Sequence, residues 1–102
     1  DNEGYPPEAW LQYIRNYDPN VDFAPISMFV DILREGWWMP DWGYVLHRKY
    51  RGVQKLELHT GGWSGNEEII REILVNPYLT HFKMRYVKWY TGGHYYFKIK
   101  VE

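Results

Sequence analysis

The final segment of the chain, residues 94–101, alternates so strictly that it requires a sheet with one buried face. Every second position carries a large apolar or aromatic side chain: Tyr95, Phe97, Ile99 and Val101. The positions between them carry polar or basic groups: His94, Tyr96, Lys98 and Lys100. Successive side chains of a strand point to opposite faces, so this pattern predicts a strand with one face in a core and the other in solvent. Such strands are typical of antiparallel sheets.

Three more segments have the composition of strands. Residues 44–50 and 53–60 flank Arg51-Gly52 and indicate a β-hairpin, although Arg-Gly is a weaker turn signal than Asn-Gly. Residues 79–90 lead through Thr91-Gly92-Gly93, a tight turn, into the final strand. In the first hairpin, alternation directs Tyr44 and Leu46 to the core, with Tyr50 as a further candidate, and directs Leu56 and Leu58 to the same face.

Apolar residues at helical spacing predict three helices. The first follows Pro6-Pro7, with an apolar stripe made by Trp10, Tyr13, Ile14 and Tyr17. The second covers residues 25–35, with Ile26, Phe29, Val30 and Leu33 inward. The third covers residues 66–75 and ends at Asn76-Pro77, with Ile69, Ile70, Ile73 and Leu74 inward.

We therefore predict an α+β fold in the order ααββαββ, with an antiparallel sheet of about four strands and helices packed on one face. A chain of 102 residues is long enough to form a hydrophobic core without disulfides or a structural metal, and the absence of cysteine excludes disulfides. We expect a single domain over residues 1–102. Residues 1–5 form its loose N-terminal end, residues 6–35 its two helices, and residues 43–101 a ββαββ core.

The segment from His59 to Glu68 joins a predicted strand to a predicted helix through three glycines and a tryptophan. Ser64 and Glu67 have the spacing of a capping box, which predicts a helix N-terminus suited to an anion. The candidate binding residues here are Gly61, Gly62, Trp63, Ser64 and Asn66. A purely structural role, in which the glycines shape the turn and Trp63 fills the core, is the alternative.

His59 and His94 each lie beside a Gly-Gly pair at the end of a predicted strand. If the two strands are neighbours, the imidazoles form an acid–base pair, which makes a nucleotide-binding protein or phosphoesterase one hypothesis. The repeated H-x-T/S pattern of two-histidine phosphoesterases is absent, so we assign no catalytic residue and expect no enzyme. The four histidines are too scattered to predict a metal site, and we expect no cofactor.

Basic residues dominate the predicted polar face of the sheet: Lys49, Lys55, Lys83, Arg85, Lys98 and Lys100. Together with Tyr96, this face suits single-stranded nucleic acid, by backbone charge and base stacking. The net charge of −1 argues against strong global attraction to nucleic acid or membranes. A solvated outer face, with lysines that discourage edge-to-edge pairing, is the simpler interpretation.

Aromatic residues make up 20% of the chain, and three tryptophans crowd the connector at residues 36–43. Three indoles in so short a segment are difficult to bury together, and exposed apolar patches usually mark interfaces. Trp38 is therefore a candidate contact for a partner, which includes a second copy of the chain.

The pattern HTGGWSGNEEII, followed later by GGHYYF, resembles small uncharacterised proteins of bacteriophages and prophages, over about residues 53–101. The resemblance implies a protein that binds and blocks a host component, including an anti-defence inhibitor. Our first hypothesis is a non-enzymatic binding protein in the host cytoplasm, without a membrane partner. It would occlude or sequester a host protein or small ligand.

Overall fold

The computed structural model describes residues 6–22, 25–80, 84–90 and 93–100, with the backbone alone for residues 84–90, Asn20 and Asp22. Its elements, in chain order, are α1 (Glu8–Asn16), α2 (Pro19–Asp22), α3 (Ile26–Gly36), α4 (Pro40–Gly43), β1 (Tyr44–Leu46), β2 (Val53–His59), α5 (Ser64–Val75), β3 (Met84–Tyr90) and β4 (His94–Lys100). The predicted N-terminal end at residues 1–5, as well as Lys83, Gly92 and Val101, lies outside the described residues.

The four strands form one antiparallel sheet in the order β1-β2-β4-β3. Because β2 and β3 both pair antiparallel with β4, they run parallel to each other, with β4 between them. Helix α5 makes the crossover that such a parallel pair requires. This topology places the end of β2 beside the start of β4, and His59 is directly opposite His94 in the register.

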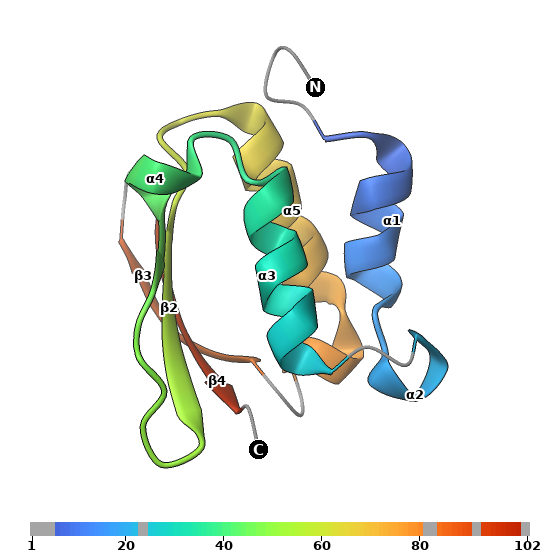
Figure 1. The fold of residues 1–102 in the computed structure, drawn as a ribbon. Coiled ribbons are helices and arrows are strands. Elements are labelled where there is room, and N and C mark those ends of the chain that lie inside the picture. The colour runs from blue at the N-terminus through green and yellow to red at the C-terminus, as the bar shows by residue number, and fades with distance from the viewer. Residues whose placement is uncertain (1–5, 23–24, 81–83, 91–92, 101–102) are drawn as a thin grey trace.

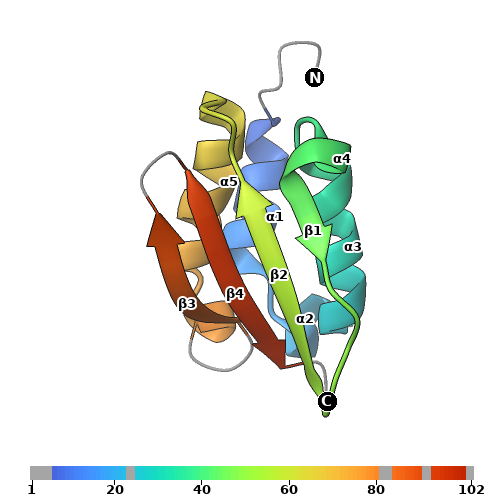
Figure 2. The same cartoon turned by 90° about the vertical axis from the view of Figure 1, so that its left-hand side faces the viewer.

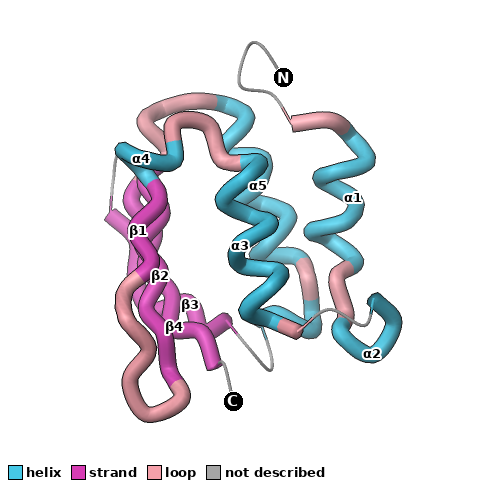
Figure 3. Tube along the Cα trace, viewed as in Figure 1, coloured by secondary structure: helices cyan, strands magenta, loops and turns pink. Residues whose placement is uncertain are grey.

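Helices α1, α2, α3 and α5 lie on one side of the sheet, with α3 and α5 between the sheet and α1, whereas α4 lies at the end of the sheet where β1 begins (Figures 1 and 3). The opposite side, which we call the outer face, has no helix in front of it (Figure 2). Fully buried side chains from both layers form the core, among them Leu56, Leu58, Phe97, Ile99, Phe29, Leu33, Ile69 and Ile73. Burial of one such side chain stabilises the fold by about 1.5–3 kcal/mol, so the core fixes which face of each strand points inward.

The first hairpin contains a one-residue shift that keeps its apolar side chains inside. Arg51 and Gly52 both have positive φ, 53° and 76°, and Tyr50 pairs with Val53 across them. Continued without a shift, this register would pair Leu46 with Glu57, whereas Leu46 in fact pairs with Leu56. A slip of one residue turns a side chain to the other face. The irregular stretch at residues 47–49 absorbs the shift, so β1 is shorter than the predicted strand over 44–50.

The α+β class and the antiparallel sheet are confirmed, whereas the short helices α2 and α4 were not predicted from the sequence. The inward assignment of Leu74 is wrong: its side chain is 38% exposed, whereas Ile73 is completely buried. Leu74 continues the apolar pattern of α5 beyond the stripe that contacts the core.

The strand predicted over residues 79–90 begins only at Met84. Asn76 is buried after the end of α5, and its side-chain oxygen accepts a hydrogen bond of 3.0 Å from the Leu79 backbone N–H. The backbone carbonyl oxygen of Asn76 accepts a second hydrogen bond, also of 3.0 Å, from the Thr80 hydroxyl. These bonds hold residues 77–80 in a helical turn. The Asn76-Pro77 pair thus ends α5, as predicted, and starts a turn in place of a strand.

Candidate binding face

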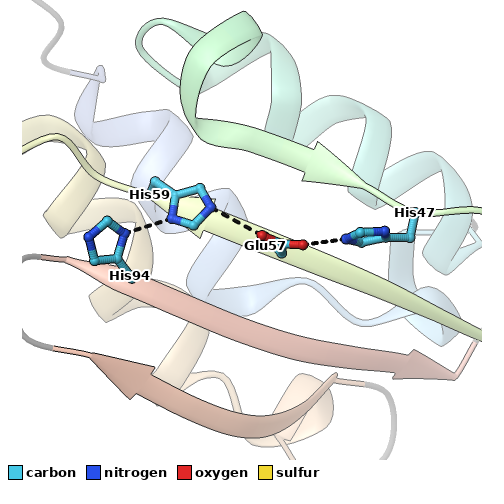
Figure 4. A network of polar contacts seen from close by, with 4 residues as sticks. All are labelled: His47, Glu57, His59 and His94. Carbon is cyan, nitrogen blue, oxygen red and sulfur yellow. Dashed lines mark hydrogen bonds and ion pairs between the residues drawn. The ribbon is translucent and has the colours of Figure 1, made fainter.

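The outer face brings together predicted site residues from two strands that are distant in sequence. Outward positions of β2 and β4 contribute Lys55, Glu57, His59, His94, Tyr96 and Lys98. The Nδ1 atoms of His59 and His94 lie 2.8 Å apart, at hydrogen-bonding distance (Figure 4). The expectation that these histidines meet if their strands are neighbours is therefore confirmed.

Five aromatic or imidazole rings form a continuous cluster at this end of the sheet, which we call the ring cluster: Trp42, Trp63, His59, His94 and Tyr96. Neighbouring centroids are 5.0–6.3 Å apart, from His59–His94 to Trp42–His59. All four contacts are edge-to-face, an arrangement that aromatic pairs favour. Trp42 is the most open member, with 57% of its surface exposed.

Beyond Tyr96 the outer face becomes cationic. A shallow hollow of about 340 Å³ beside Tyr96 is lined by His47, Lys55 and Lys98 among others. A second hollow shares these three residues and extends to Arg48 and Arg51 at the tip of the first hairpin. The two hollows form one shallow trough that leads from the ring cluster to the hairpin tip.

The chain's charges are strongly separated, although they nearly cancel overall. Segments 44–60 and 84–100 of the sequence, which include all four strands of the sheet, contain a single acidic residue, Glu57. The same segments contain eight basic residues: Arg48, Lys49, Arg51, Lys55, Arg85, Lys88, Lys98 and Lys100. The net charge of −1 is therefore the sum of a basic sheet and an acidic remainder, a separation that creates a positive potential over the sheet.

Glu57 lies between two histidines on the outer face. One carboxylate oxygen contacts His47 Nε2, and the other lies 3.3 Å from His59 Nε2 (Figure 4). The hydrogen bond with His47, and secondarily the one with His59, lowers the pKa of Glu57, against the opposing effect of partial burial. Glu57 is therefore an ionised acceptor at neutral pH.

The glycine loop after β2 supports the ring cluster. Gly61 and Gly62 have φ of 64° and 77°, a region that side chains with a Cβ rarely adopt. The Trp63 ring packs against Gly61, where a Cβ would collide with it. This contact favours the structural interpretation of Gly61, and the positive φ of both glycines forms the turn that sets Trp63 beside Trp42.

The predicted capping box at the start of α5 is wrong. Trp63 occupies the N-cap position without a side-chain cap, and Ser64 is exposed. Glu67 instead accepts hydrogen bonds from the Thr60 hydroxyl at 2.9 Å and the Tyr95 hydroxyl at 3.4 Å. Because its carboxylate is engaged with the end of β2 and with β4, it does not reach back to the N-terminus of the helix.

Asn66, another predicted binding residue, is completely buried. Its side-chain oxygen accepts a 2.9 Å hydrogen bond from the Trp38 backbone N–H. Its amide group donates to the Trp38 carbonyl at 3.1 Å and the Thr60 carbonyl at 3.4 Å. Asn66 thus fastens the tryptophan connector to α5 below the outer face, with no surface of its own for a ligand.

The three connector tryptophans have different environments. Trp37 is buried in the core, Trp38 is half-buried, and Trp42 in α4 is exposed. Met39 beside them is 53% exposed. The open indole of this connector therefore belongs to Trp42 rather than to the predicted contact Trp38.

The remaining predicted site residue, Arg85, pairs through its backbone with Lys98, which pairs in turn with Lys55. The side chain of Arg85 lies outside the described part of the structure. Glu57 and His47 were not selected as site residues from the sequence. The i, i+2 spacing of Glu57 and His59 on an outward strand face was the signal for their contact.

Within the described ranges, no three histidine, aspartate or glutamate side chains form a group suited to a metal ion. None of the described helices has the length and apolar character of a membrane span. No protein-family model, curated protein or solved structure matches this chain. The resemblance to phage proteins therefore stays a prediction.

Proposed function

We propose that this protein binds single-stranded nucleic acid along the outer face of its sheet. The observation that carries the proposal is the continuity of the ring cluster with the cationic trough on the one face that no helix covers. Proteins that bind single strands without strong sequence preference combine these two features, a basic groove for phosphates and aromatic rings for bases.

The arrangement favours an unpaired strand over a duplex. Stacking on exposed rings needs bases whose faces are free, and it contributes about 1–3 kcal/mol per base. Trp42 and Tyr96 are the rings best suited to this role, since Trp42 is open and Tyr96 borders the trough. β2 has seven residues, so the face is about 23 Å long, enough for a short segment of extended strand.

Fluorescence anisotropy with a labelled oligonucleotide of mixed sequence tests the proposal, on protein freed of nucleic acid by nuclease treatment. Lys55→Ala and Lys98→Ala should each weaken binding and reduce the salt slope of log K by about 0.7. Trp42→Ala should weaken binding with little change in that slope. Arg71→Ala, which removes an exposed cation from α5, is the matched control and should bind like the parent.

Two results would overturn the proposal: an affinity that does not fall with salt, or equal losses in Arg71→Ala and Lys98→Ala. Duplex DNA of the same sequence should bind more weakly, because its bases are not free to stack on Trp42 and Tyr96.

The hypothesis of a phage-type protein that occludes a host protein is the second candidate. The exposure of Trp42 in α4 and of Met39 at the N-cap of the same helix favours it. A host protein that co-purifies from bacterial lysate after nuclease treatment, and is lost in Trp42→Ala but not in Lys98→Ala, would support this candidate. If the host protein is lost in both variants, and nucleic-acid binding is lost with it, the result would support the first proposal, binding of single-stranded nucleic acid.

A further inference from the structure

A relay of four side chains crosses the outer face in the order His94, His59, Glu57 and His47 (Figure 4). His59 contributes both ring nitrogens, Nδ1 to His94 at 2.8 Å and Nε2 to Glu57 at 3.3 Å. The side chain of His59 is only 17% exposed, which holds the centre of the relay away from bulk water.

The chemistry of the donors fixes the proton positions along this relay. An ionised carboxylate only accepts hydrogen bonds, so the His59 Nε2 facing Glu57 carries a hydrogen. In its neutral form His59 has one N–H, which leaves its Nδ1 as an acceptor. The proton between the two rings therefore belongs to His94 Nδ1. His94 Nε2 is left with a free lone pair, and Figure 4 shows the second ring nitrogen of His94 pointing away from His59.

This is the arrangement of a general base: one imidazole nitrogen is free, and the other is held by a hydrogen-bonded chain that ends in a carboxylate. When His94 accepts a proton, its Nδ1–H remains hydrogen-bonded to His59, and Glu57 stabilises the new positive charge through His59. The arrangement goes beyond the sequence analysis, which found two histidines without a context for catalysis.

We propose that His94 Nε2 removes the proton of a ribose 2′-hydroxyl, so that the protein cleaves RNA bound on its outer face. The inference rests on the proposed function, which supplies the strand. The 2′-oxygen attacks the adjacent phosphorus as its proton passes to His94, and the bond from phosphorus to the 5′-oxygen breaks. The leaving 5′-oxygen takes a proton from water, and His94 later returns its proton to solvent. The products are a 2′,3′-cyclic phosphate and a 5′-hydroxyl.

In this reaction His94 is the catalytic residue, whereas His59 and Glu57 are positioning residues. General base catalysis contributes about 10²- to 10⁴-fold, so His94→Ala should lose that factor in kcat. Glu57→Gln removes the negative charge that fixes the hydrogen on His59 Nε2. The glutamine amide N–H is also able to donate a hydrogen bond to His59 Nε2, which would reverse the direction of this bond. We expect Glu57→Gln to lower kcat without raising KM, and Glu57→Asp to restore part of kcat.

The experiment uses a 5′-labelled RNA oligonucleotide, a DNA of the same sequence, and the same RNA with every 2′-hydroxyl methylated. Anisotropy measures binding, and denaturing gels measure cleavage and the cyclic phosphate. The expected result is cleavage of RNA alone by the parent and by Arg71→Ala. Loss of cleavage in His94→Ala, and its partial rescue by added imidazole, would identify the missing base and exclude a contaminating nuclease.

RNA that binds but is not cleaved overturns this inference and leaves the proposed function in place. Cleavage that persists in His94→Ala, or cleavage of the methylated RNA, also overturns it. A failure of all three oligonucleotides to bind overturns the proposed function itself.

Discussion

Replacing Asn66 with alanine should destabilise the protein far more than its position in a surface loop-to-helix junction suggests. The change removes the side-chain partners of both backbone groups of Trp38: the acceptor 2.9 Å from its N–H nitrogen and the donor 3.1 Å from its carbonyl oxygen. An unsatisfied backbone group costs about 1–3 kcal/mol, and partial exposure of Trp38 favours the lower half of that range. The Thr60 carbonyl keeps its 3.1 Å bond from the Trp63 N–H, so it adds little. We therefore expect a loss of about 2–4 kcal/mol in the free energy of unfolding.

Urea denaturation followed by tryptophan fluorescence measures this loss, as a lower midpoint with an unchanged m-value. In a domain of this size the melting temperature should fall by about 8 °C or more. Ser64→Ala is the control: Ser64 is exposed and caps nothing, so its replacement should change stability by less than about 0.5 kcal/mol. A loss below about 1 kcal/mol in Asn66→Ala, or a cap-sized loss in Ser64→Ala, would refute the reasoning.

Three further changes test other parts of the structure. Ile73→Ala should cost about 2–5 kcal/mol of unfolding free energy in urea titrations, whereas Leu74→Ala, at 38% exposure, should cost under about 1 kcal/mol; similar losses would contradict the orientation of α5. Arg51→Asn should raise the melting temperature in calorimetry, since Asn tolerates the φ of 53° in a turn followed by glycine; a lower value would count against this turn. Because the folded-state pKa of Glu57 lies below its ordinary value of 4.5, its stabilising contribution is complete above that pH and disappears as the pH falls through the folded pKa. Glu57→Gln should therefore flatten the acid side of the stability profile, and an unchanged profile would contradict the lowered pKa.

Local periodicity was a good guide to which face of each element is buried. The alternation through β4 predicted the inward positions of Phe97 and Ile99, and both are buried. The assignment of buried positions failed at Leu74, where the apolar pattern of α5 continues beyond the residues that contact the core. Prediction also failed where a side chain had two possible hydrogen-bond partners. Glu67 is such a case: its spacing from Ser64 predicts a capping box, but its carboxylate instead accepts a hydrogen bond from the Thr60 hydroxyl. The spacing in sequence gives no indication of this second partner.

The candidate site divides in the same way. The sequence by itself determined that Lys55, His94, Tyr96 and Lys98 face outward, because side-chain direction in a strand follows from position alone. It also placed His59 and His94 at strand ends.

Only the tertiary structure decided that β4 lies between β2 and β3, and hence that His94 meets His59. Pairing between distant strands depends on the crossover through α5 and on the packing of the whole core, which no local pattern encodes. For the same reason, the burial of Asn66 and the exposure of Trp42 became evident only once every element had its neighbours.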